Sequence, residues 1–95
     1  MFKFKDFAEG RSKAENVEIT KTMLDNLPQK IDLIKHSETY IGSQNQVEDN
    51  YDLILISDFE SLETLEEYKI HPDHVAVGEF MRPVRISRSC IDYEI

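Results

Sequence analysis

Cysteine is almost absent from this sequence of 95 residues, and Cys90 is its single example. No intramolecular disulfide can form, which is typical of proteins from a reducing compartment rather than of secreted ones. The sequence also lacks a hydrophobic run long enough to cross a bilayer, and its first residues lack the apolar core of a secretion signal. These absences predict a cytoplasmic protein without a membrane span.

Basic residues are scarce, with 11 Lys and Arg against 19 Asp and Glu and a formal net charge of −8. A surface of this sign repels nucleic-acid phosphates and anionic lipid head groups, so neither is a predicted partner. The local basic run Arg82, Arg85 and Arg88 is too short for a binding groove. We expect these arginines to pair with acidic side chains, some of them across a dimer interface.

Signatures of cofactor binding are missing as well. There is no glycine-rich phosphate loop, no dinucleotide fingerprint and no nucleophile elbow. His71 and His74 flank Asp73, but Pro72 restrains their convergence, and two histidines with one acid make a poor metal site. We therefore predict no cofactor and no metal.

The chain length predicts one domain over residues 1–95, with a thin hydrophobic core. A core of this size favours self-association, because a dimer can bury an apolar sheet face that one protomer leaves open. A homodimer is therefore the predicted assembly.

The first half of the chain is predicted to form a strand, a helix and a second strand. Residues 1–5 alternate apolar and charged side chains, which indicates a strand with one buried face. After a turn at residues 7–11, Ser12 and Glu15 form a capping box for a helix that Pro28 is expected to end. A second extended segment is predicted over residues 31–41, followed by a polar loop over residues 42–50.

The second half begins with the strongest strand signal, residues 51–59, which is apolar on both faces and so needs cover on both. Ser61 is expected to cap the next helix, His71 to cap another, and Pro72 to occupy its first turn. Pro83 should bend or shorten that helix. Residues 90–95 alternate again and are predicted to form the last strand.

This element order predicts an α+β fold of the ferredoxin-like, split βαβ type. Such a fold has a four-stranded antiparallel sheet with helices on one face. If the opposite face meets a second protomer, the result is a dimeric α+β barrel.

Residues 51–93 also carry a family resemblance. The segment NYDLILISDFESLETLEEYKIHPDHVAVGEFMRPVRISRSCIDYE resembles the stress-responsive A/B-barrel family in its aromatic-led strand, its HPxH turn and its final D-Y strand. The resemblance implies dimers whose sheets pack face to face, and a cleft between the sheet and helices of each protomer. Family members carry further residues before FKFK, including a histidine, so the first strand is expected to be shortened here by a late start or a trimmed chain.

Most members of the family have no assigned activity, but one plant branch resembles a polyketide cyclase that uses a histidine and a tyrosine in an aldol condensation. The matching positions are His74, the second histidine of the HPxH motif, and Tyr68, at the end of the preceding helix. A base for carbon-acid chemistry should be neutral near pH 7. The alternative is structural, with His74 bracing the turn and Tyr68 filling the core.

The remaining residues expected to line a ligand cleft are Tyr51, Leu53, His71 and Phe80. Three functions stay open on the sequence alone. The first is a dimer that binds a small apolar or aromatic molecule without turnover. The second is an enzyme of the cyclase or lyase kind, and the third is a structural protein whose interior is packed shut.

Overall fold

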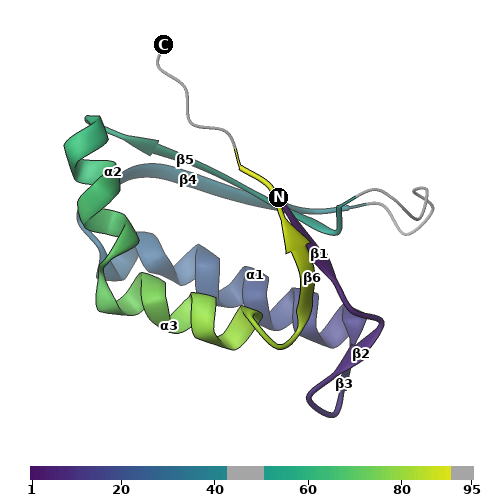
Figure 1. The fold of residues 1–95 in the computed structure, drawn as a ribbon. Coiled ribbons are helices and arrows are strands. Elements are labelled where there is room, and N and C mark those ends of the chain that lie inside the picture. The colour runs from purple at the N-terminus through teal and green to yellow at the C-terminus, as the bar shows by residue number, and fades with distance from the viewer. Residues whose placement is uncertain (43–50, 91–95) are drawn as a thin grey trace.

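The structure, a computed structural model, describes residues 1–42 and 51–90. Four strands form an antiparallel sheet in the order β4-β5-β1-β6. Their bounds are β1 Phe2–Phe4, β4 Ile34–Ile41, β5 Leu53–Phe59 and β6 Arg85–Arg88. The helices α1 (Lys13–Lys30), α2 (Leu62–Lys69) and α3 (Pro72–Met81) lie on one side of this sheet (Figure 1). The predicted antiparallel sheet with helices on one face is therefore confirmed.

A small hairpin precedes α1 where the sequence predicted only a turn. Strands β2 (Phe7–Ala8) and β3 (Arg11–Ser12) pair antiparallel, with Glu9 and Gly10 at the turn. Both turn residues have positive φ, 55° for Glu9 and 75° for Gly10. This two-residue connection with two positive φ values is the usual geometry of a tight hairpin, because its twist matches that of the strands.

Helix α1 starts as predicted but runs further. Ser12 accepts a hydrogen bond from the Glu15 amide, and the Glu15 carboxylate accepts one from the Ser12 amide. The prediction that Pro28 ends the helix is wrong, because α1 continues to Lys30. A proline this close to the end removes only one helical hydrogen bond. The helix is then closed by the Ile31 amide, which donates to the Leu27 carbonyl at 2.8 Å.

The fourth strand also differs from its prediction. The expected strand at residues 90–95 lies almost wholly outside the described residues, and the sheet's fourth strand is β6, at Arg85–Arg88. Helix α3 ends at Met81, close to Pro83 as predicted, and Val84 inserts into the core with no exposed surface. Because Val84 is fixed there, the chain enters the sheet at the next residue and pairs with β1.

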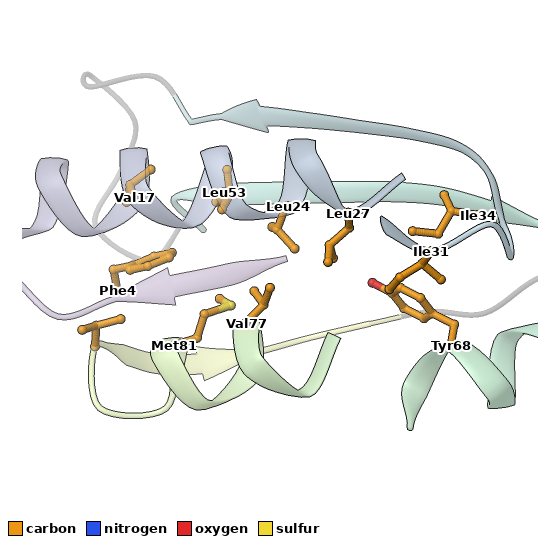
Figure 2. Packing of buried hydrophobic residues seen from close by; sticks show 11 residues of the cluster. Phe4, Val17, Leu24, Leu27, Ile31, Ile34, Leu53, Tyr68, Val77 and Met81 are labelled. Atoms are coloured by element: carbon orange, nitrogen blue, oxygen red, sulfur yellow. The ribbon is translucent and has the colours of Figure 1, made fainter. Parts of the chain in front are cut away.

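The core lies between the sheet and the helices (Figure 2). Phe4 of β1 and Leu53 of β5 come from the sheet, and Val17, Leu24 and Leu27 come from one stripe of α1. The other buried members of this cluster are Ile31, Ile34, Tyr68, Val77, Met81 and Val84. Tyr68 extends from α2 into this cluster, so the core reaches the predicted site.

The side of the sheet away from the helices carries a mixed surface, called the open face below. Leu53, Leu55 and Phe59 belong to the core side of β5, so the intervening residues of that strand point the other way. Their partners on β4 lie directly opposite them. The open face is defined by the pairs His36–Asp58, Glu38–Ile56 and Tyr40–Ile54. Tyr40 is 53% exposed and Ile56 39% exposed, so strand β5 does have apolar residues on both faces, as predicted.

Candidate functional site

The junction between α2 and α3 holds the two residues singled out by the sequence. Ser61 caps α2 through the Thr64 amide, and Tyr68 lies in the last turn of that helix. His71 caps α3, since its Nδ1 accepts a hydrogen bond from the Asp73 amide at 3.1 Å, and Pro72 follows in the first turn. These caps fix the turn, and His74 is thereby placed in the first turn of α3.

His74 and Tyr68 are in direct contact. Their ring centroids are 4.3 Å apart and their planes are inclined at 44°. The Nδ1 atom of His74 lies 3.1 Å from the backbone carbonyl oxygen of Lys69. A carbonyl oxygen can only accept, so Nδ1 must carry the proton of this hydrogen bond. In the neutral ring, Nε2 therefore holds the lone pair that a general base needs.

Burial is the main cause that lowers the pKa of His74 below its usual value of 6.5. The hydrogen bond to the Lys69 carbonyl raises the pKa and opposes this effect, whereas the positive charges of Arg88, His71 and Lys69 lower it further. Because the net shift is downward, the imidazole is neutral at pH 7. A neutral ring with a free Nε2 lone pair is the protonation state that a base requires.

Tyr68 contributes the complementary group, a protonated phenol. Its side chain is buried, and this desolvation raises its pKa to about 12. The ring also packs against Phe59 of β5, with centroids 4.8 Å apart. Within residues 1–42 and 51–90 the hydroxyl has no hydrogen-bond partner, yet no fully enclosed side-chain oxygen in that range lacks one. The hydroxyl therefore keeps some access to solvent and is free to donate to a ligand.

The pair combines a hydrogen-bond donor with a proton acceptor at one place on the surface of the core. Such a combination can hold a carbonyl oxygen and accept a proton from a neighbouring carbon or hydroxyl group. It can equally hold a ligand without reaction. Phe59 is the residue here that the sequence reasoning did not place at the site, because it precedes the start of α2 whereas Tyr68 lies in its last turn.

The other residues predicted to line a cleft are spread along the molecule. His71 is close enough for its charge to act on His74. Leu53 is fully buried six residues from Phe59, roughly 20 Å away along β5. Phe80 lies near the opposite end of α3, where the Arg11 guanidinium sits 5.2 Å from its ring centroid. Tyr51 is half-buried just before β5. A cleft role for these four residues remains a prediction.

A shallow groove of about 130 Å³ lies between α1 and α3, away from the Tyr68 ring. Its lining residues are Thr22, Met23, Asn26, Leu27, Lys30, Asp73, Ala76 and Val77. Pockets that enclose small organic ligands usually measure roughly 300–1,000 Å³. The groove is thus too small to enclose such a ligand, and neither Tyr68 nor His74 lines it.

Two further features of the described residues concern metals and membranes. Within residues 1–42 and 51–90, His, Cys, Asp and Glu side chains form no group of three that could hold a metal ion. In the same ranges, none of the helices has both the length and the apolar character needed to cross a bilayer.

The sheet order and the helix layer define a protein of the ferredoxin-like α+β class, and known structures agree. A dimeric protein of unknown function and ferredoxin-like fold from Bacteroides fragilis is 30% identical, with a TM-score of 0.85, over 99% of this chain and 89% of that one. A dimeric ferredoxin-like protein of unknown function from Thermobifida fusca is 23% identical, with a TM-score of 0.81, over 100% and 85% of the two chains.

The family follows from the sequence match. The model of the stress responsive A/B barrel domain matches residues 1–95, and the chain belongs to this family. It is also similar to olivetolic acid cyclase from Cannabis sativa, with 36% identity over 85 residues that span 86% of this chain and 78% of the relative. The predicted family and fold class are both confirmed.

Proposed function

We propose that this protein is a cytoplasmic homodimer whose Tyr68–His74 pair binds a small apolar or aromatic molecule in each protomer. The Bacteroides fragilis relative, at 30% identity, is described as dimeric, which supports a dimer here. Tyr40 and Ile56 leave large apolar surface on the open face, which supports this face as the contact between protomers. The single cysteine is in keeping with a reducing cytoplasm.

The proposed binding site rests on two polar atoms at the α2–α3 junction that have no hydrogen-bond partner among the described residues. The Tyr68 hydroxyl has no partner among the described residues, and the His74 Nε2 atom is left as an acceptor by the Nδ1 contact to Lys69. Phe59 and the body of Tyr68 supply aromatic surface next to these atoms. A ligand with an apolar ring and one polar group would satisfy both.

Binding can be tested with 2-naphthol as a neutral aromatic probe. We expect it to shift the NMR signals of the His74 ring, with saturation, and to shift them much less in the Tyr68→Phe variant. Tyr40→Phe is the matched control, because it removes the hydroxyl of an exposed tyrosine on the open face. If neither 2-naphthol nor other aromatic probes perturb His74, the interior is packed shut and the protein has a structural role.

A second candidate function is catalysis of the cyclase or lyase kind, and the similarity to olivetolic acid cyclase favours it. In this scheme Nε2 of His74 takes a proton from a carbon next to a carbonyl, and the electron pair of that C–H bond forms an enolate. The Tyr68 hydroxyl then donates a hydrogen bond to the enolate oxygen. The neutral state of His74 and the protonated state of Tyr68 are the ones that this step needs.

Proton abstraction can be measured without knowing the substrate. S-ethyl acetothioacetate has acidic methylene protons, and their exchange in D₂O can be followed by NMR at neutral pH. We expect the protein to accelerate exchange and His74→Ala to lose at least about tenfold of that rate, as general bases contribute 10²–10⁴-fold. An exchange rate that is the same with and without protein would leave ligand binding as the function.

A further inference from the structure

One residue on the core side of β5 departs from the apolar pattern of that strand. Leu53, Leu55 and Phe59 belong to the core or pack against it, and Ser57 lies on the same face between Leu55 and Phe59. Ser37 of β4 is its direct partner in the strand pairing. Removing a hydroxyl from water costs free energy unless a hydrogen bond compensates, so two serines at this place are expected to have a polar role.

The two hydroxyls do not exhaust each other's capacity for hydrogen bonds. Their Oγ atoms are 3.3 Å apart, which is longer than the roughly 2.5–3.0 Å of a usual bond between two hydroxyls. Only one of the two protons can lie in this contact, and the other has no acceptor within residues 1–42 and 51–90. Since both serines are half-buried rather than enclosed, the pair can donate to an oxygen of a ligand and also accept from it.

A neighbouring hydroxyl on the same face shows what a purely structural role requires. Thr39 lies two residues further along β4, opposite Leu55, and is 7% exposed. Its Oγ1 atom donates a hydrogen bond to the Asp25 carboxylate of α1, so its proton is used inside the protein. In the part of the chain that the structure describes, no helix supplies such an acceptor to Ser37 or Ser57. The serine pair therefore keeps hydrogen-bonding capacity that the fold does not use.

The serine pair lies beside the part of the sheet that Tyr68 covers. The next residue of β5 on the core side is Phe59, whose ring contacts Tyr68. Residues two positions apart on a strand are separated by about 7 Å, so Ser57 lies about that far from Phe59. Figure 2 shows the Tyr68 hydroxyl directed towards Leu27 and, beyond it, the Leu53 end of β5. Because Ser57 lies between Phe59 and Leu53, the hydroxyl is directed towards the part of β5 that holds the serine pair.

We infer that the Tyr68–His74 site takes an elongated neutral aromatic ligand with an oxygen at each end, and that the Ser37–Ser57 pair binds the oxygen far from His74. This inference rests on the proposed binding function and narrows it to a class of ligand. The near oxygen is held by the Tyr68 hydroxyl and Nε2 of His74, and the ring lies against Phe59. The serine hydroxyls are uncharged and can both donate and accept, so the far oxygen they match is a hydroxyl or a carbonyl.

Two probes of nearly identical shape test the far oxygen. 2,6-Dihydroxynaphthalene carries a hydroxyl at each end of a rigid ring system, and 6-methyl-2-naphthol has a methyl group in place of one hydroxyl. Titration of each probe is followed by the NMR signals of the His74 ring. We expect both probes to shift these signals, with 2,6-dihydroxynaphthalene binding more tightly, because it alone can form a hydrogen bond at the far end.

The role of the serine pair is tested by Ser57→Ala. We expect this variant to bind 2,6-dihydroxynaphthalene about fivefold more weakly and 6-methyl-2-naphthol within about twofold of the wild type, since one neutral hydrogen bond is lost. Retained binding of the methyl probe also shows that the variant is folded. Ser37→Ala removes the other hydroxyl of the pair and should weaken 2,6-dihydroxynaphthalene binding by about twofold or more.

Ser87→Ala is the matched control, because Ser87 is also a strand serine but lies on the other face of the sheet. It is opposite Lys3, which follows the core-packed Phe2 in β1, and it is exposed. We expect this variant to bind both probes like the wild type.

The outcomes separate this inference from the proposed function. If both probes shift the His74 signals but Ser57→Ala and Ser37→Ala bind 2,6-dihydroxynaphthalene like the wild type, the serine pair has no part in recognition and the binding site stands. A loss in Ser87→Ala as large as that in Ser57→Ala would overturn the assignment in the same way. If neither probe perturbs His74, both the site and the assignment fail.

Discussion

The carboxylate of Asp52 accepts a hydrogen bond from the backbone amide of Phe4, with a distance of 2.9 Å. The same Oδ2 atom lies 3.7 Å from the Lys13 ammonium, and the side chain of Asp52 is only 14% exposed. One side chain thus ties the start of β5 to β1 and to the first turn of α1. A stability test of this residue probes the assembly of the three elements.

We expect Asp52→Ala to lower the free energy of unfolding by about 2 kcal/mol, because the amide of the buried Phe4 loses its acceptor. Asp52→Asn keeps an oxygen acceptor and loses only the attraction to Lys13, so its cost should stay below about 1 kcal/mol. Urea unfolding followed by circular dichroism measures both. Equal costs for Ala and Asn would mean that charge, and not the hydrogen bond, is what stabilises this junction.

Two substitutions of Tyr68 separate the contribution of its ring to stability from that of its hydroxyl. Tyr68→Ala removes a buried ring that contacts Phe59 and His74, and truncations of this kind cost roughly 3–5 kcal/mol. Tyr68→Phe keeps the ring and removes a hydroxyl without a partner among the described residues, so it should change the free energy of unfolding by less than about 1 kcal/mol. Thermal unfolding of the two variants, each compared with wild type, checks the contrast. A large loss with Phe would reveal a structural role for the hydroxyl.

The pKa of His74 predicts how stability depends on pH. The native ring has a pKa below the 6.5 of an unperturbed histidine, so the unfolded chain binds the proton more readily. The contribution of His74 to stability is therefore complete above about pH 6.5 and declines as pH falls through the native pKa. Urea unfolding between pH 5 and 8 should show this decline, and His74→Gln should reduce its slope. An unchanged slope in the variant would contradict the assignment.

The proposed dimer predicts different effects from two substitutions of isoleucine to lysine. Ile56→Lys places a charge on the open face and should convert the dimer to a monomer at micromolar concentration, because an unpaired charge would be buried. Ile70→Lys changes a residue at the α2–α3 junction that is 78% exposed and should leave the dimer intact. Sedimentation velocity reports both masses. A wild-type monomer at micromolar concentration would remove the basis of the dimer proposal.

Local signals in the sequence predicted most of the fold. The Ser12–Glu15 capping box and the Pro72 helix start depend on neighbours within a few residues, so their patterns were sufficient. The end of α1 was not predicted, because the two residues beyond Pro28 are held by the Ile31–Leu27 hydrogen bond and by burial of Ile31 in the core. The position of β6 likewise depends on Val84 and on pairing with a strand more than 80 residues away.

For the candidate site, too, local sequence signals predicted some residues and missed those that depend on the tertiary fold. Tyr68, His71 and His74 are neighbours in sequence, and the helix caps bring them together. The aromatic contact of Tyr68 with Phe59 comes from strand β5, which the helix caps do not determine.

The position of β1 between β5 and β6 also has a consequence for biosynthesis. Phe4 is fully buried, but its neighbour strand β6 and the core residue Val84 are made about 80 residues later. A nascent chain on the ribosome can form α1 and the β4–β5 hairpin early, while β1 waits with one edge unpaired. Closing so long a loop is slow. We therefore expect the protein to acquire its native sheet only after residue 88 has left the exit tunnel, with β1 exposed to chaperones until then.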